Sequence, residues 1–66
     1  MHIQLNGEPY ELHADQTLAD LLERMELGGR RVAVELNLEI VPRSQYADTR
    51  LSEGDRIEVV HAIGGG

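Results

Sequence analysis

The sequence predicts an α+β domain in which one helix packs across one face of a mixed, four- to five-stranded sheet. Short segments with apolar residues at every second position surround one segment with helical spacing, and the chain has only 66 residues. A chain of this length buries roughly 60% of the surface that it exposes when unfolded, so it forms one thin core. The helix and the strands must therefore share that core.

The first segment of the chain predicts a β-hairpin. Residues 1–5 alternate between apolar and polar side chains, which is the pattern of a half-buried strand. Asn6 and Gly7 follow, and this pair readily adopts the positive φ angles of a tight hairpin turn. The alternation resumes over residues 10–13 and completes the hairpin.

A helix of about ten residues is predicted after the hairpin. Thr17 is a suitable N-cap, and Asp20, three residues later, can complete a capping box. Gly28 and Gly29 are expected to end the helix, because glycine readily adopts the conformation that follows a helix. The apolar residues at helical spacing should face the sheet: Leu18, Leu21, Leu22 and Met25.

Two or three strands are predicted after the helix. Residues 32–37 alternate, residues 40–41 form a short apolar run that Pro42 ends, and residues 56–63 alternate again. Residues 43–50 are mostly polar and are expected to form a connection or a single helical turn. The sheet residues predicted to pack against the helix are Ile3, Leu5, Val34, Leu36, Ile57 and Val59.

This order of elements favours the β-grasp fold, in which a helix crosses a mixed sheet. Residues 1–63 would form the domain, and residues 64–66, all glycine, would form a flexible tail. Val60 and Ala62 alternate with the core residues of the last strand and should face outward beside this tail. We predict that they form a partner-docking surface, since exposed apolar groups suit such a contact.

The composition excludes several classes of function. Without cysteine, the chain can form neither a disulfide nor a thiolate metal site. A net charge of −6 disfavours nucleic acid; it suits a partner with a basic docking surface and, equally well, a small protein that its acidity keeps soluble. No stretch approaches the roughly 20 apolar residues of a membrane span. The first residues do not resemble a signal peptide, so a cytoplasmic protein without membrane contact is expected.

The sequence contains no recognisable catalytic or metal-binding motif. His2, His13 and His61 have a spacing that matches no known ligand pattern, and we interpret them as surface residues of the sheet. A domain of this size also offers little room for an enclosed active site, which usually needs on the order of 300 Å³. We therefore expect no catalytic residues, no bound metal or cofactor, and no enzymatic activity of the chain itself.

The final glycines, Gly64, Gly65 and Gly66, have no side chain that could pack on a core. Such a tail either has no role or enters a narrow channel of a partner, where a β-carbon would block the backbone. Fully extended, residues 63–66 reach at most about 14 Å, enough to deliver a carboxyl group into a partner's active site. The glycines alone leave both interpretations open.

Two internal stretches and the glycine end resemble the ThiS family of thiamine-biosynthesis sulfur carriers, which are ubiquitin-like β-grasp proteins. The more specific stretch is Asn37-Leu38-Glu39-Ile40-Val41-Pro42-Arg43. The other is Leu51-Ser52-Glu53-Gly54-Asp55-Arg56-Ile57-Glu58, which precedes the final Gly65-Gly66. The Gly-Asp turn and the Gly-Gly end are shared with the small subunit of molybdopterin synthase. Tyr46 stands where the family often has tryptophan, and Gly64 is an additional glycine.

The resemblance implies that the Gly66 carboxyl is adenylated and converted to a thiocarboxylate, which donates sulfur for thiazole formation. Gly64 and Gly65 would enter the active site of a partner. The implied partners are an adenylating (E1-like) enzyme that uses ATP, a sulfur-donating persulfide enzyme and a thiazole synthase. The chain would act as their substrate, not as an enzyme.

Other functions remain open at this point. The sulfur acceptor could be a molybdopterin precursor or another molecule, although the stretch Ile40-Val41-Pro42-Arg43 favours thiazole. A β-grasp interaction module with an inert tail is an alternative from another class. A protein modifier that forms isopeptide bonds is a further, weaker alternative.

Overall fold

Five strands and two short helices make up the computed structural model, which describes residues 1–61. The strands are β1 (His2–Leu5), β2 (Glu8–Glu11), β3 (Val32–Leu36), β4 (Glu39–Val41) and β5 (Arg56–His61). The helices are α1 (Leu18–Arg24) and the 3-10 helix η1 (Arg43–Asp48). The predicted strands are confirmed, although the second lies at Glu8–Glu11 and not at residues 10–13, and the polar segment before β5 contains η1. Residues 62 and 63, predicted as the end of the last strand, lie outside the described residues.

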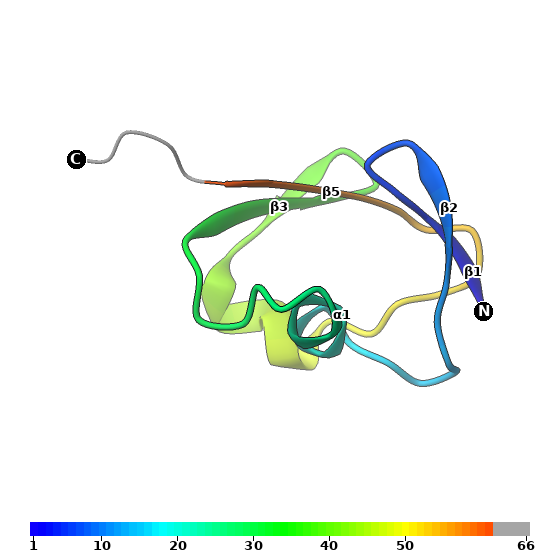
Figure 1. The fold of residues 1–66 in the computed structure, drawn as a ribbon, viewed down its shortest axis with the longest axis horizontal. Coiled ribbons are helices and arrows are strands. Elements are labelled where there is room, and N and C mark those ends of the chain that lie inside the picture. Colours follow the sequence, from blue (N-terminus) through cyan, green and yellow to red (C-terminus); the bar gives the residue numbers. More distant parts are fainter. Residues whose placement is uncertain (62–66) are drawn as a thin grey trace.

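The strands form one mixed sheet in the order β2-β1-β5-β3-β4, and both helices lie on one side of it (Figure 1). The last strand, β5, occupies the centre of the sheet. It runs parallel to β1 and antiparallel to β3. On their sides away from β5, β1 forms a hairpin with β2, and β3 forms a hairpin with β4. This is the predicted β-grasp arrangement of a helix across a mixed sheet.

Both hairpins turn through two residues with positive φ. In the first turn, Asn6 has a φ of 52° and Gly7 a φ of 83°, as the sequence predicts. In the second, Asn37 has a φ of 52° and Leu38 a φ of 72°. Tight hairpin turns of this type require positive φ at both positions, for which Asn-Gly is well suited. Leucine is not, because a left-handed conformation costs a residue with a β-carbon about 1 to 2 kcal/mol.

The start of α1 is capped as predicted. The backbone N–H of Asp20 donates to Thr17 Oγ1 at 3.2 Å, and the N–H of Thr17 donates to Asp20 Oδ2 at 3.0 Å. These two bonds complete the capping box and satisfy backbone donors that an unprotected helix start would leave free.

The end of α1 differs from the prediction. The helix has only seven residues, and Glu26, not Gly28 or Gly29, adopts the left-handed conformation, with a φ of 61°. The N–H of Leu27 donates to the carbonyl of Leu22 at 2.8 Å, a bond typical of a helix that ends through a left-handed residue. The helix therefore ends before the glycines.

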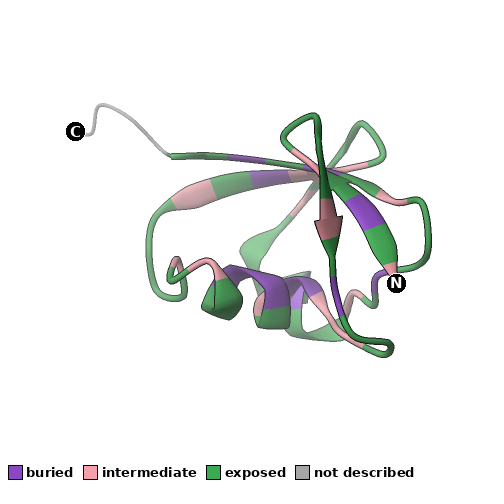
Figure 2. Ribbon diagram, turned by 45° about the vertical axis from the view of Figure 1, so that its right-hand side comes forward, coloured by how far each residue is buried: buried purple, intermediate pink, exposed green. Residues whose placement is uncertain are grey.

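The core lies between α1 and the sheet, where buried residues line the helix face that points toward the strands (Figure 2). Of the predicted core, Leu5, Leu36 and Met25 are only half-buried, and the other seven residues are buried. The core also contains three residues outside the predicted set: Leu12, Tyr46 and Leu51. Tyr46 belongs to η1, so this short helix closes the core beside α1.

We predict that Leu22→Ala lowers the free energy of unfolding by about 2 to 5 kcal/mol, because it leaves a cavity in the core. Leu22 is 4% exposed. The matched control is Leu38→Ala, the same change at a side chain that is 72% exposed, with an expected effect within about 0.5 kcal/mol. Urea unfolding measures both. Equal midpoints for the two variants would contradict the packing of α1 on the sheet.

Candidate functional site

The two hairpin turns hold β5 from both sides through asparagine side chains. Asn6 Oδ1 accepts a hydrogen bond from the N–H of Val59 at 2.8 Å, and Asn37 Oδ1 accepts one from the N–H of Arg56 at 3.0 Å. Backbone bonds add to both contacts, since the N–H groups of the same asparagines donate to carbonyls of β5 at 2.8 Å. The sheet therefore fixes the position of His61, the last described residue of the chain.

The predicted reactive residue, Gly66, lies outside the described residues, as do Gly64, Gly65 and Ala62. Their roles remain predictions. Val60, the other predicted docking residue, is 59% exposed and follows the buried Val59. Because successive side chains of a strand point to opposite faces, Val60 lies on the sheet face that the helices leave uncovered, as predicted.

A shallow hollow of about 410 Å³ occupies this uncovered face. Its walls come from β1, β3, β5 and the two hairpin turns, and its lining includes Asn6, Glu35, Leu38, Arg56, Glu58 and Val60. We call it the outer hollow. It lies next to the end of β5, because Val60 is the residue before His61.

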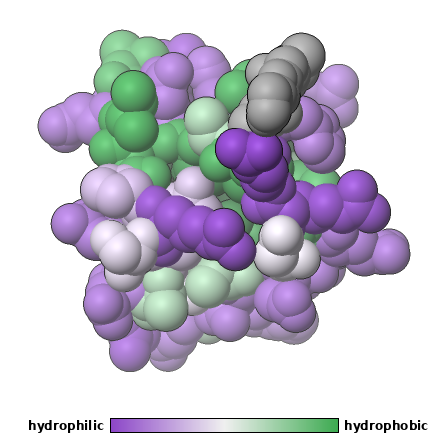
Figure 3. All heavy atoms as spheres, turned by 90° about the vertical axis from the view of Figure 1, so that its left-hand side faces the viewer, coloured by the Kyte–Doolittle hydropathy of each residue, from purple (hydrophilic) through white to green (hydrophobic). Residues whose placement is uncertain are grey.

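The uncovered face of the sheet exposes more apolar surface than the sequence indicated. The exposed large apolar residues of the described chain are Leu38 at 72%, Ile40 at 78% and Val60 at 59%. Ile40 pairs with Glu35 across β3 and β4, which puts both on the uncovered face. The end of the molecule where β5 ends shows hydrophobic atoms exposed among hydrophilic ones (Figure 3). Alternation along β4 would predict that Ile40 faces outward. The sequence does not reveal that β3 and β4 form a hairpin, because the turn between them is not Asn-Gly.

Two carboxylates face each other in the outer hollow. Glu35 of β3 pairs directly with Glu58 of β5, and both line the hollow. Within residues 1–61, neither carboxylate forms an ion pair. Like charges at directly opposite strand positions repel each other, and a partner's basic side chain would remove that repulsion. Arg56, which lines the hollow on the same face of β5 as Glu58, offsets one of the two negative charges and leaves a net negative charge that suits a basic docking surface on a partner.

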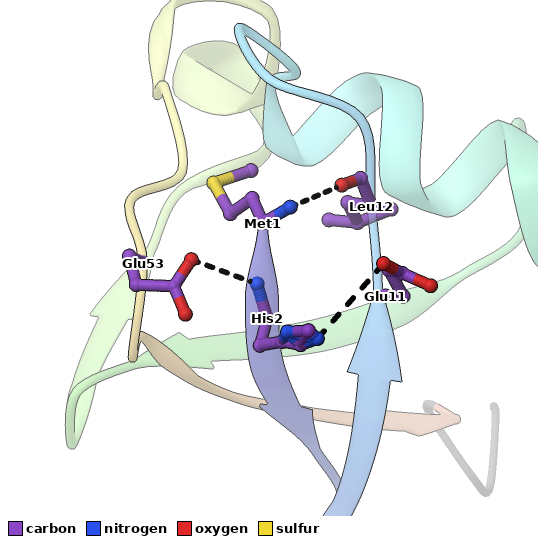
Figure 4. Close-up of polar contacts among 5 residues, drawn as sticks. All are labelled: Met1, His2, Glu11, Leu12 and Glu53. Carbon is purple, nitrogen blue, oxygen red and sulfur yellow. Dashed lines mark hydrogen bonds and ion pairs between the residues drawn. The ribbon is translucent and has the colours of Figure 1, made fainter.

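The histidines lie on the surface and do not converge. His2 Nε2 is 3.9 Å from Glu11 Oε2, between side chains that are 68% and 77% exposed (Figure 4). The backbone N–H of His2 donates to Glu53 Oε1 at 2.9 Å, which links β1 to the turn before β5. His13 and His61 are also exposed. Within residues 1–61, no group of three or more histidine or acidic side chains could hold a metal ion.

No helix in the described part of the chain has the length and apolar character needed to cross a membrane.

Residues 3–66 match the ThiS family. The chain belongs to the ThiS family. It is 40% identical over 65 residues to the sulfur carrier protein ThiS of Bacillus subtilis, covering 97% of this chain and 98% of that protein. The crystal structure of the thiamine biosynthesis protein ThiS of Geobacter metallireducens has a TM-score of 0.87, at 29% identity and with complete coverage of both chains. The family and the fold that the sequence motifs indicated are thereby confirmed.

A further relative is much longer than this chain. The thiazole synthase of Paramagnetospirillum magneticum is 46% identical over 66 residues, which are all of this chain but only 20% of that protein. This chain therefore spans about a fifth of that relative, which contains a ThiS-like segment within a longer polypeptide.

The family motif lies beside the outer hollow and contributes Leu38 to its lining. Its asparagine, Asn37, bonds to β5, its isoleucine, Ile40, is exposed on the uncovered face, and Pro42 is the N-cap of η1. One short stretch of sequence thus builds a wall of the hollow and starts the element that closes the core.

We predict that Asn6→Gly lowers the free energy of unfolding by about 1 to 3 kcal/mol, because the partly buried N–H of Val59 loses its acceptor. Glycine tolerates the positive φ of this position, so the turn itself is not strained. Asn6→Asp keeps an acceptor oxygen and serves as the control, with stability close to that of the parent. Thermal unfolding followed by circular dichroism gives both values. A fully stable Asn6→Gly variant would show that this bond does not hold β5.

Proposed function

We propose that the chain carries sulfur for thiazole formation in thiamine biosynthesis, as a thiocarboxylate on the Gly66 carboxyl group. The observation that carries this proposal is membership of the ThiS family over residues 3–66, which include the final glycines. The near-complete alignment with a sulfur carrier protein of almost the same length supports it.

The chemistry uses the backbone because no side chain is suitable. The chain has no cysteine, so no side-chain thiol can hold sulfur. A free carboxylate is a poor electrophile, and transfer of AMP from ATP to Gly66 would make its carbonyl carbon reactive, with release of pyrophosphate. The outer sulfur of a cysteine persulfide would attack that carbon and expel AMP. Cleavage of the resulting sulfur–sulfur bond by a second thiol would leave the thiocarboxylate.

The catalytic groups for these steps would come from partner proteins. An adenylating (E1-like) enzyme would bind ATP, a persulfide enzyme would supply sulfur, and a thiazole synthase would receive it, all in the cytoplasm. The occurrence of a ThiS-like segment within a thiazole synthase supports the last of these partners. Gly64 and Gly65 would pass through the narrow entrance of a partner's active site, where any β-carbon would obstruct the backbone.

We predict that deletion of Gly65 and Gly66 abolishes thiocarboxylate formation and leaves the domain folded, since the described core ends upstream. Residues appended after Gly66 should abolish it equally, because the carboxyl then becomes an amide. The parent, incubated with the adenylating enzyme, ATP and a persulfide donor, should gain the mass of one oxygen exchanged for one sulfur. Intact-mass and peptide mass spectrometry should locate this change on the C-terminal peptide.

The control for this experiment is His2→Ala, which removes an exposed side chain from β1 and should still form the thiocarboxylate. The proposal is wrong if the extended protein supports thiazole formation without being trimmed back to Gly66.

We also predict that Val60→Asp slows adenylation without unfolding the domain. An added carboxylate would disturb an apolar contact beside the end of β5 and increase the local negative charge. Ser44→Asp adds the same charge to η1, on the other layer, and should leave adenylation unchanged. Pyrophosphate release at several protein concentrations measures the effect. Equal rates for Val60→Asp and the parent would remove Val60 from the docking surface.

A further inference from the structure

The second hairpin has a leucine where the first has a glycine. Both turns begin with an asparagine at a φ of 52°, and their second residues, Gly7 and Leu38, have φ angles of 83° and 72°. Leu38 thus holds a left-handed conformation that glycine adopts without strain. Its side chain is 72% exposed, so it adds almost nothing to the core.

The turn has little freedom to relax around Leu38. The preceding residue, Asn37, donates from Nδ2 to Asp55 Oδ1 at 3.1 Å and accepts at Oδ1 from the N–H of Arg56 at 3.0 Å. These bonds hold the turn against the start of β5 and keep the leucine side chain over the outer hollow, which it lines. An uncommon backbone conformation with no benefit to the fold suggests a functional contact.

A second unfavourable feature lies in the same hollow. Glu35 and Glu58 stand directly opposite each other, and neither forms an ion pair within residues 1–61. The exposed leucine and the opposed carboxylates each destabilise the isolated domain locally. Both become favourable on a surface that offers an apolar recess for the leucine and a basic side chain for the carboxylates.

We infer that Leu38 is an anchor for the thiazole synthase, which accepts it in an apolar recess and places a basic side chain between Glu35 and Glu58. This inference rests on the proposed function, in which the synthase receives sulfur from Gly66. The hollow reaches Val60, next to the end of β5, so a partner that receives the glycine tail is positioned to cover it. We assign the synthase as this partner because one relative, itself a thiazole synthase, contains a ThiS-like segment in the same polypeptide.

The test is Leu38→Gly, measured by titration of the purified thiazole synthase with the complete carrier. We expect a melting temperature at or above that of the parent, because glycine removes the strain. The affinity for the synthase should fall about tenfold, the effect of losing one well-placed apolar anchor. Leu38→Met keeps an apolar side chain of similar size and should bind within about threefold of the parent.

Glu26→Gly is the matched control. Glu26 is exposed and has a φ of 61°, so glycine relieves the same kind of backbone strain there, at the end of α1 and on the other layer. It should raise the melting temperature similarly and leave the affinity for the synthase unchanged. The double variant Glu35→Gln, Glu58→Gln should bind the synthase with an affinity that depends less on salt concentration. Salt screens the attraction between the two carboxylates and the partner's basic side chain, and the variant lacks both carboxylates.

Two readouts distinguish this inference from the proposed function. With saturating adenylating enzyme, Leu38→Gly should still form the thiocarboxylate, because the substitution leaves the Gly66 carboxyl group unchanged. If the parent forms no thiocarboxylate, the proposed function fails. If the parent forms it but Leu38→Gly binds the synthase as tightly, or the synthase does not bind the parent, the inference is wrong. A loss of affinity for the adenylating enzyme alone would also overturn the assignment.

Discussion

The insertion of β5 between two hairpins is the constraint on which the rest of the molecule depends. An isolated hairpin is marginally stable in water, and each hairpin here gains a neighbour only through β5. The bonds that hold it are long-range in sequence: Val59 is 53 residues from Asn6, whose side chain accepts from its N–H. The core can therefore close only when the end of the chain has joined its beginning.

Because β5 is a strand at the centre of a two-layer domain, one of its faces packs in the core and the other is available to a partner. Ile57 and Val59 point toward the helices and are buried, while Glu58 and Val60 point to the uncovered side and line the outer hollow. The strand that brings Gly66 to a partner thus also presents the surface next to it. A substitution on one face can alter docking with little effect on folding, and the reverse also holds.

The two hairpin turns have similar backbone conformations but differ in strain. Asn6 and Asn37 adopt the same conformation and bond to the same strand from opposite sides. The first turn follows with glycine and is unstrained, whereas the second follows with an exposed leucine. The second turn is supported by the bonds of Asn37 to Asp55 and Arg56, which compensate for its backbone conformation locally.

Features that depend on near neighbours were predictable from the sequence: the period-two strands, the Asn6-Gly7 turn and the capping box of Thr17 with Asp20. Its motifs also identified the family. The tertiary structure was needed for the strand order, the burial of Tyr46 and Leu51, and the exposure of Leu38 and Ile40 on the side of the sheet that the helices leave uncovered. Those features depend on contacts between distant residues, which periodicity does not record. The helix end was missed for a local reason: Glu26 took the left-handed position for which glycine was the better candidate.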